Sequence, residues 1–229
     1  MLRGNKTYLN KEVFINYKRN MNEIQIPQTY DMDIRYWTDG ANIFYAGPDF
    51  IIKKADIKSF TLYTGWFAKD KNRCYFEGSA FKKADPETFE VLNWAFAKDR
   101  NHVYTNRGIL KDADPNTFEV LDDGYLRYVW IAPTGFGRDK NHIFHYAYGG
   151  KTQILKDADF DSFVVVDHDF GKDKNSVFWN GRKLKNANPA TWINVDIFST
   201  DGENFYAGSD LLKGAEVNKA RTEIEKNRK

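Results

Sequence analysis

Aspartates recur along this chain at one place in a short polar turn, and carboxylates repeated in this way suggest a test for calcium binding. One anchor aspartate stands in each of six segments: Asp39, Asp70, Asp99, Asp139, Asp173 and Asp201. A calcium loop also needs further oxygen ligands and a bidentate glutamate, and the segments lack them. Hydrogen bonding of each aspartate to its own backbone is enough to explain the pattern. We therefore expect no metal at these turns.

Histidine and cysteine are too sparse for a standard zinc site. The histidines are His102, His142, His145 and His168, and the single cysteine is Cys74. Cys74 falls in a predicted strand, where a buried structural thiol is favoured over a nucleophile. GxSxG, P-loop and GxGxxG patterns are absent, and the abundant carboxylates fall at equivalent turns and caps. We expect no catalytic residues, no cofactor and no enzyme activity.

The anchor aspartates mark a repeat that runs through most of the chain. Successive anchors are 31, 29, 40, 34 and 28 residues apart, which resolves into a unit of 29 residues plus insertions of about 11 and 5 residues. The longer insertion precedes Asp139 and the shorter follows Asn141. Repetition at this period is typical of arrays in which each unit buries its apolar face against its neighbours.

Aromatic residues recur in three columns in register with the anchors. Three residues before each anchor stand Tyr36, Phe67, Phe96, Phe136, Phe170 and Phe198. Five residues after it stand Phe44, Tyr75, Tyr104, Phe144, Phe178 and Tyr206. The third column, five residues beyond a recurring Ala, is Phe60, Phe89, Phe118, Phe163 and Trp192. We interpret these rings as a continuous core, with a base-stacking platform as the alternative.

The turns between the columns predict short strands and one helical turn in each unit. Asp-Lys-Asn is suited to a hairpin turn, and Gly-containing pairs such as Glu77-Gly78 mark a second turn. Asp85-Pro86 combines an N-cap with proline at the first helical position. We predict an all-β array of about six hairpin repeats, elongated and twisted, with a closed propeller-like ring as the alternative. Residues 1–35 would form an N-terminal cap segment, 36–214 the array, and 215–229 a charged helix or tail.

Composition narrows the class of protein and its compartment. Hydrophobic residues make up 41% and charged residues 29% of the 229 residues, which is typical of a globular protein. The formal net charge of +2 gives no global field that demands nucleic acid or a membrane. One cysteine, together with the lack of an apolar leader or membrane-length run, predicts a cytoplasmic protein.

The order of these motifs is similar to that of the bacterial DKNYY family. The resemblance rests on Asp-Lys-Asn followed by an aromatic and then by Ala-Asp-Pro-x-Thr-Phe, as at Asp70 to Tyr75 and Asp99 to Tyr104. It covers about Tyr36 to Gly214. The resemblance implies a bacterial or phage origin and a repeat fold. It brings no catalytic residues, because no activity is established for the family.

The insertions supply the candidate binding residues. Tyr, Arg and Trp are enriched in binding hot spots, and the predicted partner-binding residues are Tyr125, Arg127, Tyr128, Trp130, Tyr146 and Tyr148. The alternative is a longer hairpin that only covers a gap in the array.

Three functions fit these features. The first is a non-enzymatic interaction protein that binds and masks or inhibits a macromolecular partner, either a protein or a ribonucleoprotein, as in toxin immunity or phage anti-defence. The second is binding of RNA or single-stranded nucleic acid through lysines before the recurring Ala, namely Lys82, Lys83, Lys111, Lys156, Lys183 and Lys185. These lysines would otherwise keep strand edges soluble. The third is a structural spacer or cell-surface module.

Overall fold

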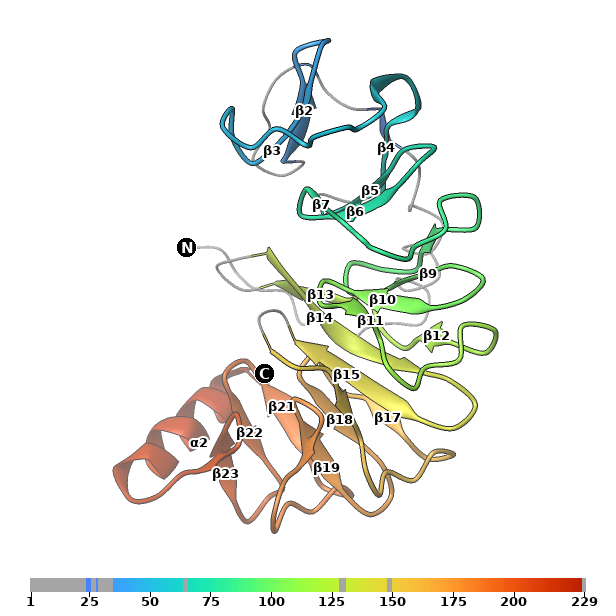
Figure 1. The fold of residues 1–229 in the computed structure, drawn as a ribbon. Coiled ribbons are helices and arrows are strands. Elements are labelled where there is room, and N and C mark those ends of the chain that lie inside the picture. Colours follow the sequence, from blue (N-terminus) through green and yellow to red (C-terminus); the bar gives the residue numbers. More distant parts are fainter. Residues whose placement is uncertain are drawn as a thin grey trace.

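The computed structural model describes residues 24–25, 28, 35–63, 66–127, 131–147 and 150–227. In this part of the chain, short antiparallel strands form six small sheets that follow one another along the sequence. The sheets are arranged along an open arc, and the first and last of them lie at its opposite ends (Figure 1). The predicted array of hairpin repeats is therefore confirmed, and the alternative of a closed ring is wrong.

Three of the six sheets contain four strands of two or three residues, one contains two strands, and two contain five. The first holds β2 (Tyr36–Thr38) and β3 (Ile43–Tyr45), and the second holds β1 (Ile24–Gln25), β4 (Thr61–Leu62), β5 (Phe67–Lys69), β6 (Cys74–Phe76) and β7 (Ser79–Ala80). The third holds β8 (Glu90–Val91), β9 (Ala97–Lys98), β10 (Val103–Thr105) and β11 (Gly108–Ile109). The fourth holds β12 (Glu119–Val120), β13 (Tyr125–Arg127), β14 (Ile131–Arg138), β15 (Ile143–Ala147) and β16 (Gln153–Ile154). The fifth holds β17 (Val164–Val165), β18 (Phe170–Lys172), β19 (Val177–Trp179) and β20 (Arg182–Lys183), and the sixth holds β21 (Ile193–Val195), β22 (Phe198–Thr200), β23 (Phe205–Ala207) and β24 (Asp210–Leu211).

The two predicted turns join neighbouring strands, as in the second sheet. The Asp-Lys-Asn turn connects β5 to β6, and the Glu77-Gly78 turn connects β6 to β7. Glu77 and Gly78 both have positive φ, 47° and 70°, which is the geometry of a type I′ hairpin turn. A Cβ at Gly78 would also collide with the Tyr45 side chain of the preceding sheet. Glycine is thus required there both by backbone conformation and by packing.

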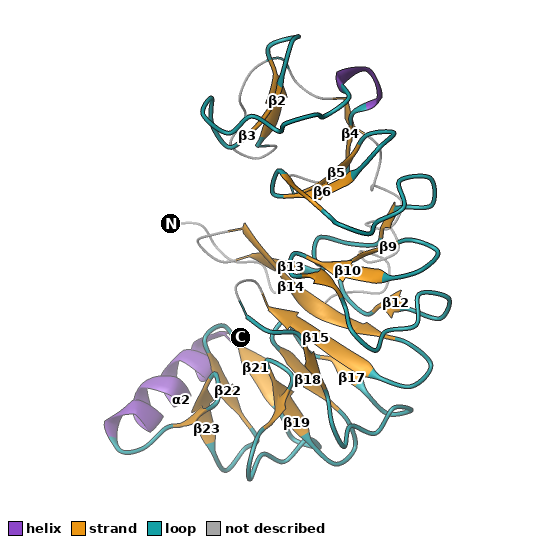
Figure 2. Ribbon diagram, in the orientation of Figure 1, coloured by secondary structure: helices purple, strands orange, loops and turns teal. Residues whose placement is uncertain are grey.

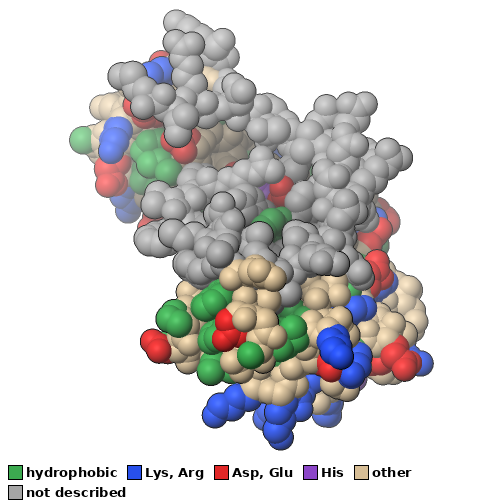
Figure 3. All heavy atoms as spheres, turned by 90° about the horizontal axis from the view of Figure 1, so that it is seen from above, with side chains coloured by type: hydrophobic (Ala, Val, Ile, Leu, Met, Phe, Trp, Pro, Cys, Tyr) green, Lys and Arg blue, Asp and Glu red, His purple; other side chains and the backbone are tan. Residues whose placement is uncertain are grey.

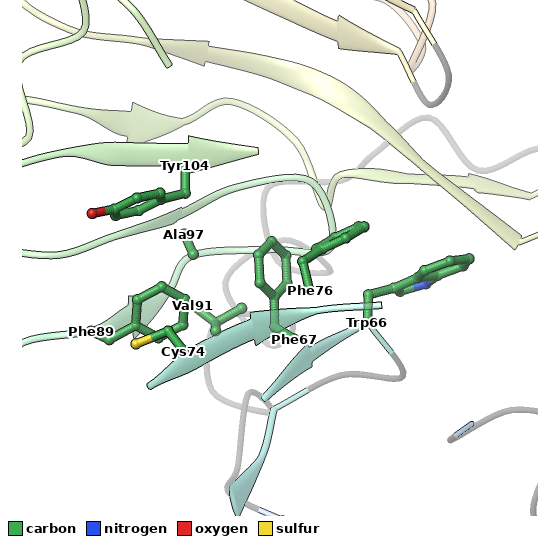
Figure 4. Close-up of a cluster of buried hydrophobic side chains, with 8 residues drawn as sticks. All are labelled: Trp66, Phe67, Cys74, Phe76, Phe89, Val91, Ala97 and Tyr104. Carbon is green, nitrogen blue, oxygen red and sulfur yellow. The ribbon is translucent and has the colours of Figure 1, made fainter. Parts of the chain in front are cut away.

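The core lies between successive sheets. Phe67 and Phe76 of the second sheet pack with Phe89, Val91 and Tyr104, which belong to the third sheet or lead into it (Figure 4). Clusters of the same kind join the other neighbouring sheets. Since each unit buries its apolar face only against its neighbours, the fold is held together interface by interface.

All three aromatic columns are buried, and no ring in them exceeds 8% exposure. Neighbouring columns contact one another, as Phe89 does Tyr104 with ring centroids 6.1 Å apart. Each buried ring contributes about 1.5–3 kcal/mol through removal from water. The core interpretation is confirmed. These rings cannot stack on bases, so the alternative of a stacking platform is wrong for them.

The anchor aspartates tie each hairpin turn to the segment before it. Asp99 Oδ1 accepts hydrogen bonds from the backbone N–H groups of Asn101 and His102, both at 2.7 Å. Its Oδ2 accepts from the backbone N–H of Asp85 and from the Tyr104 hydroxyl, both at 2.8 Å. The bond to the preceding segment recurs from Asp70, Asp139, Asp173 and Asp201. As predicted, these aspartates accept hydrogen bonds from the backbone of their own turn. They also bond the preceding segment, which the sequence did not indicate.

The Ala-Asp-Pro segments form single turns. Thr88 N–H donates to the Asp85 carbonyl at 3.3 Å, which closes one turn. Only Ile57–Ser59, where the proline is absent, is long enough to be a 3₁₀ helix (η1), and Asp56 caps it. The predicted helical turn is therefore present as an isolated turn in most units, because one hydrogen bond is too few to propagate a helix.

A single helix follows the last sheet within the described residues. Helix α2 (Ala215–Asn227) occupies the segment in which the sequence predicted a charged helix or tail. It buries Ala220 and Ile224 against Phe198 and Phe205, so it closes the apolar face of the sixth sheet (Figure 2). No helix in the described part of the chain has the length and apolar character needed to cross a membrane.

Candidate functional site

The longer insertion forms a hairpin of β13 and β14. Tyr125, Leu126 and Arg127 pair with Pro133, Ala132 and Ile131. The second half of β14 belongs to the core sheet, where residues 134–138 pair with residues 143–147 of β15. The hairpin therefore shares a continuous strand with the array. It projects from the concave side of the arc (Figure 1).

The neck of the hairpin is held by Asp122. Its carboxylate accepts from the backbone N–H of Gly124 at 2.8 Å and from that of Phe136 at 2.7 Å, so one side chain joins the two ends of the insertion. Thr134 adds two bonds, from its N–H to the Gly124 carbonyl at 3.0 Å and from its hydroxyl to the Tyr146 carbonyl at 2.9 Å. Asn93 bonds Ala95 and Phe96 in the same way in the preceding unit. The insertion thus extends a turn that the repeat already contains.

Further titratable groups surround the neck, and we call Asp122, Asp123, His145, His168 and Asp169 the neck cluster. His168 Nδ1 lies 3.4 Å from Asp123 Oδ1, and His145 Nε2 donates to the His168 carbonyl at 3.0 Å. Burial raises the pKa of Asp122 well above its ordinary value and lowers the pKa of His145 to about 4. Burial and the nearby Asp167 raise the pKa of Asp169 to about 6. The cluster links the inserted hairpin to the following unit.

The two insertions lie beside each other, as the sequence suggested. Gly135 of β14 faces Tyr146 of β15, and Thr134 faces Ala147. Tyr125 and Arg127 are placed by their backbone in β13, while their side chains are outside what the structure describes. Tyr128, Trp130 and Tyr148 lie outside the described residues.

Tyr146 is part of the core. It is fully buried, and its ring centroid lies 6.1 Å from that of Phe96 in the preceding sheet. Side chains two residues apart on a strand share a face, so Tyr146 follows Phe144 of the second aromatic column into the interior. The alternation along β15 contained this information, and the prediction of a binding role for Tyr146 overlooked it. We leave Tyr146 out of the contact surface.

The neck cluster was not predicted as a site. A polar residue three positions before the first aromatic column recurs as Asn93 and Asp167, and Asp122 is its equivalent before the insertion. This column is the signal that would have found Asp122. No recurring sequence pattern predicts the hydrogen bond between His145 and the His168 carbonyl, because it depends on how the fourth and fifth sheets stack.

The other residues considered for catalysis or metal binding are Cys74, His102 and His142, and each lies in the core or beside an anchor aspartate. Cys74 is buried in β6, and burial raises its pKa to about 12, so the nucleophilic thiolate is scarce at neutral pH. His102 and His142 lie beside their anchors, with Nδ1 4.0 Å from Asp99 Oδ1 and 3.5 Å from Asp139 Oδ1 respectively. Across the described ranges, no group of three or more His, Cys, Asp or Glu side chains is arranged to hold a metal ion.

Stacked antiparallel sheets, hairpin turns anchored by aspartate and a helix on the last sheet define this molecule as an open β-repeat array. The chain belongs to the DKNYY family, whose family model matches residues 67–210. No curated protein and no solved structure matches the chain.

Proposed function

We propose that this protein is a non-enzymatic interaction scaffold that binds and masks a macromolecular partner through the β13–β14 hairpin. The observation that carries the proposal is the fixed neck of that hairpin, where Asp122 bonds both ends of the insertion. A binding element held in one conformation loses less entropy when it associates. The array would then serve to position the hairpin.

Two further observations support this assignment. The recurring residues are used internally, since the aromatic columns form the core and the buried anchors bond to neighbouring segments. The inserted hairpin is additional to that scheme and lies on the concave side of the arc (Figure 1). Its sequence carries Tyr125, Arg127, Tyr128 and Trp130, residue types enriched in hot spots.

The test begins with capture of the partner from host lysate by tagged protein after RNase treatment, followed by binding measurements with both proteins purified. We expect the Arg127→Ala, Trp130→Ala double variant to weaken the equilibrium constant at least 100-fold, as loss of hot-spot residues does. The matched control is Phe50→Ala, Arg182→Ala, which removes an exposed aromatic and an exposed arginine elsewhere. Equal binding by the wild type and the hairpin variant, with melting temperatures unchanged, would refute the proposal.

A further inference from the structure

One lysine stands at the same position in all six units, two residues before the recurring Ala. We call these residues the lysine column: Lys53, Lys82, Lys111, Lys156, Lys185 and Lys213. All six are exposed. The column includes both end units, where the Asp-Lys-Asn turn is replaced by Asp39-Gly40 and Asp201-Gly202. Because the lysine is present even in the two units whose turn sequence differs, the turn does not account for it.

Other recurring basic residues have internal partners. In the Asp-Lys-Asn turn, Lys71 pairs with Asp56 at 2.8 Å and Lys174 pairs with Asp159 at 2.7 Å. In the position before the anchor, Lys172 donates to the Pro189 carbonyl at 2.9 Å. The lysine column has neither an ion pair nor a side-chain hydrogen bond with any described residue. Within the described part of the chain, no residue therefore neutralises these charges.

Protection of strand edges explains the column poorly. Lysine blunts an edge when it stands within the edge strand. Here each lysine from Lys82 onward comes two residues after the edge strand has ended: β7 ends at Ala80, β11 at Ile109 and β24 at Leu211. The edge strands themselves leave Ile109 and Leu211 exposed at 42% and 43%, so they are not the feature being protected.

The column lysines stand in segments that leave the last strand of each sheet. The first five segments lead to the first strand of the next sheet, and the segment with Lys213 leads to helix α2. The loops that join successive sheets lie along the outer rim, away from the concave side (Figure 2). Seen from the end of the array where β2 and β3 lie, Lys and Arg side chains are prominent along the lower edge of the molecule, with Asp and Glu side chains among them (Figure 3). Stacked sheets are about 10 Å apart, so neighbouring column lysines are separated by a distance of that order.

We propose that the lysine column is a binding site for single-stranded nucleic acid, held through its phosphodiester backbone. A row of single charges along a curved rim suits a flexible polyanion that can bend to follow it, and a stiff duplex can reach only part of the row. Because the aromatic columns are buried, base stacking adds nothing there, and binding is independent of sequence.

Salt dependence tests the proposal quantitatively. A single strand gives a slope of about −0.7 in log K against log salt for each phosphate neutralised, so six lysines predict a slope of about −4. The affinity for a fluorescent 30-nucleotide oligo-U would then fall about 300-fold between 50 and 200 mM salt. Fluorescence anisotropy measures this directly with the full chain.

The variant that isolates the column is Lys82→Gln, Lys111→Gln, Lys156→Gln, Lys185→Gln. We expect its slope to flatten by about 3. The control removes the same charge from other exposed lysines, Lys58→Gln, Lys151→Gln, Lys219→Gln, Lys226→Gln, and should leave the slope unchanged. If the fourfold column variant fails to fold, the four single substitutions should each flatten the slope by about 0.7.

Three outcomes would overturn the inference. The first is a wild-type protein whose affinity for oligo-U does not depend on salt. The second is an equal flattening of the salt slope in the control variant, which would make net charge the cause. The third is tighter binding to a duplex of the same length, which would contradict the single-stranded partner. The hairpin variant Arg127→Ala, Trp130→Ala should bind oligo-U normally, so this test is independent of the proposed function.

Discussion

Asp99 Oδ2 accepts the backbone N–H of Asp85 across 2.8 Å, and this bond fastens the hairpin turn of one unit to the cap of the segment before it. The Arg100 guanidinium forms an ion pair with the Asp85 carboxylate at 2.6 Å, so two interactions join the same two segments. Burial opposes ionisation of Asp99, but hydrogen bonds from the Asp85 amide, the Tyr104 hydroxyl and the turn amides outweigh it and lower its pKa. The same two interactions recur in the preceding unit, where Asp70 accepts the backbone N–H of Asp56 and Lys71 pairs with the Asp56 carboxylate.

Asp99→Ala should therefore destabilise the array strongly. The substitution leaves three backbone N–H groups and the Tyr104 hydroxyl without their acceptor, and we expect a loss of about 2–4 kcal/mol in the free energy of unfolding. Asp39→Ala is the control, because this anchor is exposed and bonds only within its own turn among the described residues. Urea denaturation of the two variants measures the difference. Similar losses for both would contradict the role given to the bond between segments.

Gly135→Ala should disturb the neck of the inserted hairpin. A Cβ at residue 135 would collide with the Asp122 carboxylate, which must stay in place to bond Gly124 and Phe136. Because the position is buried and cannot relax toward solvent, we expect about 2–4 kcal/mol of destabilisation. Gly47→Ala is the control, since no atom lies within 4 Å of the Cβ that would be added there. A Gly135→Ala protein as stable as the wild type would show that the neck is less rigid than described.

Asp169 should make stability depend on pH between about 4 and 6. Burial and the Asp167 charge raise its pKa to about 6, so the folded protein holds this proton more tightly than the unfolded chain does. The stabilising effect of the proton is complete below the unfolded pKa of about 4 and is lost as pH rises through about 6. Asp169→Asn has no charge to lose, so at pH 7 we expect it to exceed the wild type by on the order of 1 to 3 kcal/mol.

Unfolding of the Asp169 variant across pH 3.5 to 7.5 provides the measurement. The advantage of Asp169→Asn over the wild type should grow with pH through this window, while the exposed control Asp161→Asn should track the wild type. A constant difference at every pH would mean that Asp169 does not titrate in the folded protein as inferred.

The sequence by itself determined the repeat, its register and its core. Period, aromatic columns and turn residues are local signals, and each has one physical solution: rings spaced in register are buried, Asp-Lys-Asn closes a hairpin, and Glu77-Gly78 adopts positive φ. The charged segment after Gly214 is helical for an equally local reason. Six copies of one pattern made these inferences firmer than a single copy would.

Only the tertiary structure decided whether the array closes, where the insertion projects and what surrounds its neck. Closure depends on the small rotation between neighbouring sheets, which accumulates over six units. No single sequence motif determines this rotation. Tyr146 faces inward because β15 continues the face of Phe144, and His145 reaches the His168 carbonyl because the fourth and fifth sheets stack. Such contacts depend on packing between units, whereas the sequence pattern describes the order within each unit.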